Sequence, residues 1–573
     1  MRQLVIKTEN GYTVSGAEYA LEITDHRIAV KIENTTFAEL DVRTAVPQTL
    51  DTDDGCREDS GETLPELVSA ELTDSTGVFT WKSKSDLWEE KTYILTCNRL
   101  RFVYTVTLRG HGRVDEVRYF SGDGRNGSSY EFQDGFIPCV SWYDKEDYTF
   151  KASVGCHRWS VLMVPPMFCY AFRCEGITKR LGLGLAAEKG EHNFQSFDYV
   201  PIWNGFETGF WLKTDQAGHQ TVDGEWTAPA VIGYSGDNEW DVCAHYRDYY
   251  FTKGIAEVPS DEKKPRFWYG PMVCGWIEQT ALGVKNGVNP TMLACEETYE
   301  ELARRIHANG LHPTALIIDD KWQKHYATDE ADPEKFPDLR AFVERRRAEG
   351  IRTLLWFKLW DADGWDESLC VTEDNGTKRL DPSTPEFKAN LDRALHRILS
   401  ADAGCYNCDG FKLDFAFWNP IGRKVHASSG KYGVELLYDM MAYIYKKAKE
   451  IKPWALVNCS PAHPYFAHIC DQARLHDYSQ QNRNNREDLV MRGKCFSAAM
   501  PGVLLDTDNA GFNSRRDTMH WLLTQPYTGV PDLYSLEPTA ACQFDEADID
   551  AVRLLWEEYG ARMDALHGRD ILE

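Results

Sequence analysis

Two acidic side chains in the second half of the sequence stand next to basic ones at spacings that suit covalent acid–base chemistry. Lys412 and Asp414 lie two residues apart in the apolar run 411–415, so both side chains point to the same face of the strand expected there. A neighbouring lysine favours the ionised form of a carboxyl group, which keeps Asp414 available as an anionic nucleophile. Further along the chain, Asp477 follows Arg474 by three residues and supplies a second acid.

Carboxyl groups and tryptophans also gather where other apolar runs end. Asp319 and Asp320 end one run, with Trp322 just beyond, and Trp356 and Lys358 end the next. Taken singly, each feature has a structural interpretation: an aspartate at a strand end is often a helix cap, a lysine–aspartate pair can be an internal ion pair, and a tryptophan usually belongs to a core. Their combination is what indicates a functional site.

The elements that must position these residues alternate between strands and helices after Pro265. Glycines and prolines mark the expected helix ends, and the strands read as short buried runs. Repeated strand–helix units of this kind are typical of a (β/α)8 TIM barrel, and we predict this fold for residues 265–573. Reactive groups of such barrels lie at the C-terminal ends of the strands. Strands are expected at 315–320, 351–357, 411–415 and 454–458, and helices at 299–306, 337–349, 384–398 and 434–451.

The first part of the chain has a different pattern. Short runs of alternating apolar and polar residues, rich in β-branched and aromatic types, are separated by turn residues. We predict an antiparallel β-sandwich domain over residues 1–258, with hardly any helix. The polar stretch 258–265, bracketed by prolines, reads as a linker. The predicted fold class is therefore an α/β chain in which the barrel is preceded by an antiparallel β-sandwich.

Composition excludes several classes of partner. The 573 residues include 63 basic and 89 acidic ones, a formal charge of −26, so neither nucleic acid nor an anionic membrane is an expected partner. No apolar run approaches the roughly 18 residues of a membrane span, and the first residues lack the apolar stretch of a secretory signal. We therefore expect a cytoplasmic protein whose 16 cysteines are mostly buried and reduced.

The sequence offers no motif for a metal or an organic cofactor. Cys405 and Cys408 form a lone Cys-x-x-Cys without a second pair at zinc spacing. The Gly-Leu-Gly at 182–184 lacks the third glycine and the following helix of a dinucleotide site. No Gly-x-Ser-x-Gly, Walker or His-Glu-x-x-His motif occurs. We expect a reaction that needs no cofactor.

Taken together, the motifs resemble the retaining α-galactosidases of glycoside hydrolase family 36, which belongs to clan D. Residues 318–323 resemble the family's Asp-Asp-Gly-Trp segment, and 409–415 resemble its nucleophile strand. Residues 275–278, 458–460 and 504–508 are similar to its first-strand Trp-Glu segment, its Cys-Ser segment and a late Asn-Asp-Pro-Asp stretch. The similarity covers the barrel, and the β-rich first part fits the family's supersandwich.

This resemblance implies a role for each candidate residue. Asp414 would be the nucleophile and Asp477 the acid/base of a double displacement with retention. The other implied contacts are with the sugar: Asp319, Asp320 and Lys412 with its hydroxyl groups, Arg474 with a hydroxyl group or the acid, Trp276, Trp322 and Trp356 through their ring faces, and Lys358 and Cys459 at the pocket.

The sequence departs from the family pattern around the sugar pocket. Lys321 replaces the usual glycine after the aspartate pair, and Lys358 stands where members usually have a small or apolar residue. Residues 461–464 replace a run of glycines, and Arg474 and Asp477 are three rather than four residues apart. The two lysines suggest a sugar with an anionic substituent, such as a carboxylate or a sulfate. The alternative interpretation is that they are surface residues beyond the strand ends.

We therefore predict a retaining, exo-acting α-glycosidase, most similar to an α-galactosidase, that acts on a small α-glycoside. The alternatives are an α-N-acetylgalactosaminidase or another α-glycosidase, a transglycosylase of the raffinose-synthase type, and a non-catalytic carbohydrate-binding protein on the same scaffold. Because family members often assemble, the resemblance also includes a homo-oligomer among the expected states.

Overall fold

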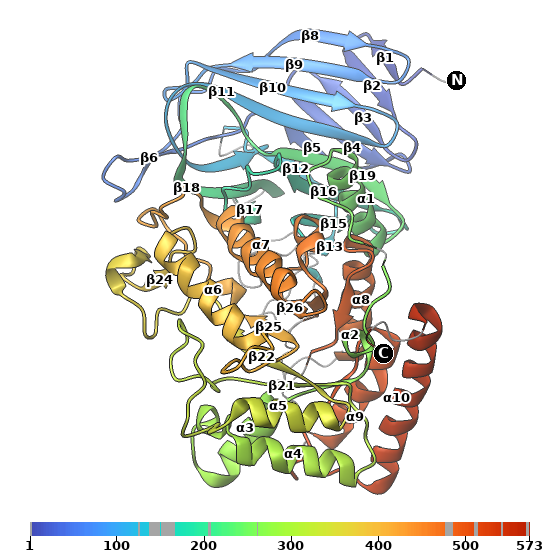
Figure 1. The fold of residues 1–573 in the computed structure, drawn as a ribbon. Helices are drawn as coiled ribbons and strands as arrows, with labels where there is room; N and C mark the ends of the chain where they lie inside the picture. The colour runs from blue at the N-terminus through green and yellow to red at the C-terminus, as the bar shows by residue number, and fades with distance from the viewer. Residues whose placement is uncertain are drawn as a thin grey trace.

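The structure is a computed structural model. It describes residues 3–123, 127–136, 149–150, 167–203, 208–260, 262–475, 485–508, 514–533, 535–539, 542–568 and 572. Antiparallel strands of the first half lie above a set of parallel strands and helices formed by the second half (Figure 1). The predicted fold class is confirmed, whereas the predicted domain boundary at 258–265 stays a prediction.

Eight parallel strands form the barrel. They pair in the order β28-β27-β26-β25-β22-β21-β20-β29, and a parallel bridge between Asp506 and Val530 closes the ring. The strands are β20 (Met272–Cys274), β21 (Ala315–Ile318), β22 (Arg352–Lys358), β25 (Gly410–Asp414), β26 (Leu456–Cys459), β27 (Gln472–Arg474), β28 (Leu504–Asp506) and β29 (Asp532–Leu533).

The helices around the barrel begin and end close to the predicted positions. Thr384 caps α6 by accepting a hydrogen bond from the amide of Phe387, and Gly310 and Gly350 adopt positive φ just beyond α4 and α5. No described helix is long and apolar enough to cross a membrane. The helices are α2 (Arg266–Tyr269), α3 (Trp276–Asn286), α4 (Glu296–Ala308), α5 (Leu339–Ala348), α6 (Pro385–Leu399), α7 (Gly433–Ile451), α8 (Asn485–Ala499), α9 (Arg515–Thr524) and α10 (Glu546–His567), with short 3₁₀ turns η1 (Pro290–Leu293), η2 (Glu367–Leu369), η3 (Ala416–Trp418), η4 (Pro464–Ile469) and η5 (Gln525–Tyr527) and a hairpin of β23 (Cys370–Thr372) and β24 (Lys378–Leu380).

Side chains on the barrel strands alternate between the interior and the surrounding helices. Charged and amide side chains such as Lys412, Asn458 and Arg474 are buried inside, near the C-terminal ends of their strands. Burying such groups is costly unless they are paired, so their collection at one end of the barrel marks a site rather than a core. A separate apolar cluster fills the interior: Phe267, Met272, Cys274, Ala315, Ile317, Leu354, Leu456 and Val530.

The first half forms one hydrogen-bonded system of antiparallel strands with a single described helix. That helix, α1 (Glu239–Thr252), was not expected from the period-two pattern, although Val242, Cys243, Tyr246 and Tyr250 are buried at helical spacing. The strands are β1 (Val5–Thr8), β2 (Gly11–Ser15), β3 (Ala20–Thr24), β4 (Arg27–Ile32), β5 (Thr35–Asp41), β6 (Gln48–Thr49), β7 (Cys56–Arg57), β8 (Glu66–Leu72), β9 (Gly77–Ser83), β10 (Glu90–Cys97), β11 (Arg101–Tyr119), β12 (Ser128–Tyr130), β13 (Asp134–Phe136), β14 (Thr149–Phe150), β15 (Cys169–Arg173), β16 (Arg180–Ala186), β17 (Phe197–Trp203), β18 (Thr208–Thr227) and β19 (Ala230–Gly236).

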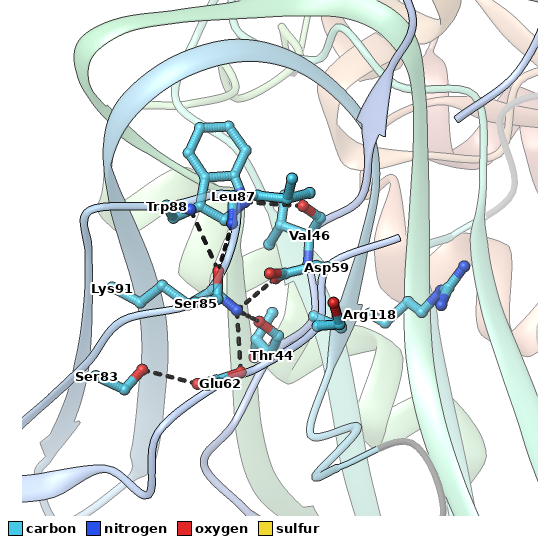
Figure 2. Close-up of polar contacts among 12 residues, drawn as sticks. Thr44, Val46, Asp59, Glu62, Ser83, Ser85, Leu87, Trp88, Lys91 and Arg118 are labelled. Carbon is cyan, nitrogen blue, oxygen red and sulfur yellow. Dashed lines mark hydrogen bonds and ion pairs between the residues drawn. The ribbon is translucent and has the colours of Figure 1, made fainter. Parts of the chain in front are cut away.

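A buried lysine holds the segment that joins β5 to β8 (Figure 2). The ammonium group of Lys91, on β10, lies 2.5 Å from a carboxylate oxygen of Asp59 and 3.0 Å from one of Glu62. It also donates to the carbonyl oxygen of Thr44 at 3.0 Å. Both Lys91 and Asp59 have no exposed side-chain surface, so their charges compensate each other inside the protein.

Replacing this lysine leaves a carboxylate buried without its cation. We expect Lys91→Met to lower the free energy of unfolding by about 3–5 kcal/mol, because breaking a buried pair strands one charge. Lys82→Met is the matched control: Lys82 pairs with Glu90 at 2.9 Å with side chains that are 45% and 30% exposed, and its loss should cost less than about 1 kcal/mol. Urea unfolding of the two variants measures the difference, and equal losses would contradict a structural role for the buried pair.

Candidate active site

The carboxylate of Asp414 lies at the C-terminal end of β25, and three donors among the described residues hold it. The indole Nε1 of Trp356 donates to Oδ2 at 3.0 Å, and the guanidinium of Arg474 donates to Oδ1 at 2.8 Å. The backbone amide of Phe415 also donates to Oδ1, at 2.8 Å. The side chain keeps 17% exposure, so this carboxylate is still reachable from the mouth of the barrel.

Lys412 does not form the ion pair with Asp414 that the sequence suggested. Its ammonium group lies 3.1 Å from Oδ2 of Asp319 and 3.4 Å from the thiol of Cys274. Burial opposes its charge, but the negative charge of Asp319, together with the contributions of Cys274 and Asp508, outweighs this and raises the pKa of Lys412. The two side chains share a face, as predicted, but Lys412 lies deeper and reaches across the barrel. The cation that stabilises a negative charge on Asp414 is Arg474 instead.

Arg474 joins three strand ends. Its side chain, 1% exposed, donates to Ser460 at 3.0 Å and lies 3.5 Å from a carboxylate oxygen of Asp508, in addition to its contact with Asp414. The sequence placed Arg474 near the sugar or the acid, and the structure places it beside the predicted nucleophile. It orients that carboxylate rather than leaving it to rotate.

The aspartate pair after β21 divides into a buried and a half-buried member. Asp319 is 2% exposed and accepts from the Cys274 thiol at 3.0 Å, besides its ion pair with Lys412. Asp320 accepts a hydrogen bond from the hydroxyl of Tyr326 at 2.7 Å. Burial raises the pKa of Asp320 to about 6, and the charges of Asp319 and Asp414 add to this.

Two of the three predicted sugar-facing tryptophans are buried. Trp322 has no exposed surface and donates its Nε1 to the carbonyl oxygen of Trp356 at 2.7 Å, so it cannot offer a ring face to a ligand. Trp356 is 1% exposed and acts through its indole N–H on Asp414. Both ring-face assignments are therefore corrected. Trp276, the first residue of α3, is partly exposed and packs against the apolar interior cluster.

Cys459 points away from the pocket. Leu456 and Asn458 face the barrel interior, where Asn458 donates to Asp506 at 2.6 Å, so the alternation of β26 turns Cys459 outward. Its thiol lies against that of Cys470 at 2.9 Å, and the side chain is fully buried. The predicted contact of Cys459 with the sugar is wrong for this reason. The next inward-facing residue is Ser460, the partner of Arg474.

Lys358 is a buried residue rather than a surface one. It is 9% exposed, pairs with Asp361 at 2.9 Å, and its ammonium lies 4.1–4.9 Å from the ring centres of Tyr326, Phe415 and Trp418. In the register of β22 and β25, Lys358 is paired with Asp414. It therefore lies close to the mouth of the barrel, with its ammonium group against the ring of Tyr326.

Lys321 also has a carboxylate partner. Its ammonium lies 2.7 Å from Asp363 and 3.8 Å from the centre of the Tyr326 ring, and its side chain is 24% exposed. Both lysines thus pack against the ring of Tyr326, and Lys358 is the more buried of the two.

Backbone strain collects at the same end of the barrel. Trp360, Phe415 and Asp508 adopt φ of 71°, 60° and 58°, a left-handed conformation that favours glycine. They follow β22, β25 and β28 closely. Strained residues of this kind persist where the surrounding structure fixes them, and they cluster at functional sites.

The site also contains residues that the sequence analysis did not assign. Tyr326 lies on a loop without any pattern that would identify it, and Ser460 and Cys274 carry no catalytic signature. Asp506 ends β28, and a carboxylate at a strand end was the signal that could have found it. Burial raises the pKa of Asp506 to about 6, and neighbouring Asp508 adds to this.

Asp477, the predicted acid/base, lies outside the described residues, which stop at Leu475 and resume at Asn485. Its role therefore stays a prediction. Among the described residues, no group of three or more histidine, cysteine, aspartate or glutamate side chains could hold a metal ion.

The raised pKa of Asp320 has a measurable consequence. A pKa raised from 3.8 to about 6 means that the folded state binds this proton more tightly, so the stabilisation is complete below about pH 4 and is lost as the pH rises through 6. We expect Asp320→Asn to be more stable than the wild type by about 2 kcal/mol at pH 7.5, with the difference vanishing near pH 4.

Asp363 provides the matched control for this experiment. Burial raises its pKa, but hydrogen bonds with Lys321 and His325 outweigh burial and lower it overall, so Asp363→Asn should destabilise the protein at neutral pH. Chemical unfolding of both variants between pH 4 and pH 7.5 measures whether each substitution raises or lowers the free energy of unfolding. If the change in stability caused by Asp320→Asn did not depend on pH, this would contradict a raised pKa of Asp320.

Solved structures of several glycosidases share this fold, and three of them are compared with this chain. The α-N-acetylgalactosaminidase NagBb from Bifidobacterium bifidum, in complex with GalNAc, is 11% identical with a TM-score of 0.61, over 98% of this chain and 94% of that one. A GH31 family sulfoquinovosidase from E. rectale, with an aza-sugar inhibitor, is 12% identical with a TM-score of 0.56, over 96% and 84%. A variant of the GH36 α-galactosidase AgaA from Geobacillus stearothermophilus, with 1-deoxygalactonojirimycin, is 12% identical with a TM-score of 0.51, over 96% and 77%.

No protein-family model matches the sequence, and no curated protein matches it. The chain thus has a fold that GH36 and GH31 glycosidases adopt, at identities that establish the fold alone.

Proposed function

We propose that this protein is a retaining, exo-acting α-glycosidase of the α-galactosidase or α-N-acetylgalactosaminidase type, related to glycoside hydrolase family 36. The observation that carries the proposal is Asp414: a partly exposed carboxylate at a strand end of the barrel mouth, fixed by Trp356 and Arg474. A nucleophilic carboxylate needs this combination of orientation, charge compensation and access. The fold shared with glycosidases supports the same conclusion.

In this mechanism Asp414 attacks the anomeric carbon while the leaving oxygen is protonated by Asp477. The resulting glycosyl ester of Asp414 is then hydrolysed by a water molecule that Asp477 deprotonates, so the configuration is retained. Arg474 and Trp356 hold the carboxylate of Asp414 in the attacking orientation and offset its charge. Asp319 and Asp320, which follow the next strand but one, would accept hydrogen bonds from sugar hydroxyl groups, with Lys412 fixing Asp319.

A covalent label tests both carboxylates at once. Incubation with a 2-fluoro glycosyl fluoride of the matching sugar should trap an ester, because the fluorine slows its hydrolysis, and peptide mass spectrometry should find it on Asp414. Fluoride leaves without protonation, so Asp477→Ala should still be labelled, whereas Asp414→Asn should not. A label on another residue would contradict the assignment of Asp414. A protein that binds sugars yet is never labelled would favour a non-catalytic carbohydrate-binding protein.

Lys358 favours a second candidate, an α-glycosidase for a sugar that carries an anionic substituent. A lysine buried at the mouth costs desolvation, and its three N–H donors exceed what one carboxylate of Asp361 uses. Its neighbour in the strand register is Asp414, so a substituent on a sugar bound there would come close to it. A sulfoquinovosidase is among the solved structures of this fold.

A panel of p-nitrophenyl α-glycosides with neutral and acidic sugars separates the two candidates. If the substituent is anionic, Lys358→Met should lower kcat/KM for the acidic substrate by about 10–100-fold, the value of a hydrogen bond to a charged group, and barely change the neutral ones. Lys321→Met is the matched control, because its ammonium is bound to Asp363 at the more exposed side of Tyr326. Equal or faster turnover of neutral sugars by the wild type would exclude the anionic candidate.

A further inference from the structure

The two longest strands of the first half, β11 and β18, lose their regular pairing at the same level. Val114 on β11 faces Gln220 on β18, but Glu116 faces Asp215, so the register shifts at Asp115 and several residues of β18 leave the ladder. Bulges bend a strand and redirect a side chain, and they are frequent near active sites. Both irregular segments contact the barrel.

The first contact is an ion pair with the loop that follows β25. Nε and Nη2 of Arg423 donate to the two carboxylate oxygens of Asp115 at 2.7 and 2.9 Å. Asp115 is 6% exposed and also accepts from the hydroxyl of Thr49 at 2.7 Å. Burial raises the pKa of Asp115, but the hydrogen bonds from Arg423 and Thr49 and the positive charge of Arg423 together lower the pKa overall. Such a bidentate pair fixes orientation as well as position.

The second contact comes from the part of β18 that leaves the ladder. Nε2 of His219 lies 2.9 Å from the carbonyl oxygen of Gly422, which neighbours Arg423. The His219 ring stacks on that of Tyr432, with 4.1 Å between the ring centres. Tyr432 precedes α7, so the loop is held near both Arg423 and its far end.

A third contact joins the same loop to the segment held by Lys91. His426 lies 3.1 Å from Asp53, and Asp53 pairs with Arg113 at 2.7 Å. In the sequence, Asp53 lies between Thr44 and Glu62. Figure 2 shows the contacts of Thr44 and Glu62 with Lys91. The buried lysine therefore anchors the base from which Asp53 reaches the barrel.

We call Asp53, Asp115 and His219, with their partners Gly422, Arg423, His426 and Tyr432, the loop clamp.

The loop that these residues hold begins directly after Asp414 and forms part of the site. Phe415 donates its amide to Asp414, and Trp418 stands 4.6 Å from the ammonium of Lys358 and 4.4 Å from the guanidinium of Arg379. Both aromatic residues are partly exposed. The loop clamp thus holds one end of the segment that follows β25. The other end of this segment, at Phe415 and Trp418, forms one wall of the barrel mouth.

We propose that the N-terminal sheet positions this wall through the loop clamp, so that Asp115 and Arg423 are positioning residues for substrate binding. The proposal rests on the function proposed above for the same site. Neither residue contacts the reacting groups, and the ion pair acts through the backbone between Arg423 and Trp418. A purely structural interface would change stability on mutation without changing substrate affinity selectively.

Asp115→Asn and Arg423→Gln remove the ion pair from either side. In both variants we expect KM for an aryl α-glycoside to rise about tenfold with kcat within about twofold, because the wall contributes to binding rather than to the chemical step. Arg423→Lys, which keeps the charge, should recover much of the affinity. In hydrogen exchange followed by mass spectrometry, peptides from 415–432 should exchange faster in Asp115→Asn than in the wild type.

Arg247→Gln is the matched control. Arg247, on α1, also joins the first half to the barrel, by donating to the carbonyl oxygen of Ala498 at the end of α8. It should leave both KM and the exchange of 415–432 unchanged. A similar rise in KM for Arg247→Gln, or faster exchange in Asp115→Asn with an unchanged KM, would overturn the positioning role. Exchange needs no turnover: a wild type that cleaves no aryl α-glycoside contradicts the proposed function, whereas unchanged exchange in Asp115→Asn contradicts the clamp.

Discussion

The ion pair between Arg474 and Asp414 is the interaction on which the site depends. It links the ends of β27 and β25, which are separated by β26 in the barrel, and it lies at the mouth where Arg474 is almost completely buried. A buried guanidinium is tolerated only when carboxylates and hydrogen-bond acceptors compensate it, and Asp508 and Ser460 contribute to this compensation. The arrangement exists only when the four neighbouring strands β25, β26, β27 and β28 are paired.

A second ion pair lies deeper in the barrel than the one between Arg474 and Asp414. Lys412 and Asp319 pair inside the barrel, and the strained backbone after β22, β25 and β28 surrounds both ion pairs. Paired charges in an interior add little to stability compared with a hydrophobic core of the same volume. Their concentration at one end of the barrel, with raised carboxyl pKa values at Asp320 and Asp506, is what a site that handles protons and hydroxyl groups requires.

The N-terminal sheet contributes to this end of the molecule through its irregularities. In a regular pairing of β11 and β18 the side chains would simply alternate between the two faces of the sheet. The register shift instead lies at Asp115 and His219, and both contact the loop after β25. The two parts of the chain therefore share one loop, in addition to a continuous apolar core. The irregular pairing lies in the sheet, whereas the loop that it positions belongs to the barrel.

The sequence by itself determined the fold class, the strand that carries Asp414, and the shared face of Lys412 and Asp414, because periodicity and side-chain alternation are local properties. It also contained the alternation that turns Cys459 outward. It could not decide that Lys412 pairs with Asp319, that Trp322 is buried, or that Arg474 meets Asp414. Those facts depend on which strand lies across the closed barrel and on how far each side chain reaches, and only the tertiary structure fixes these distances.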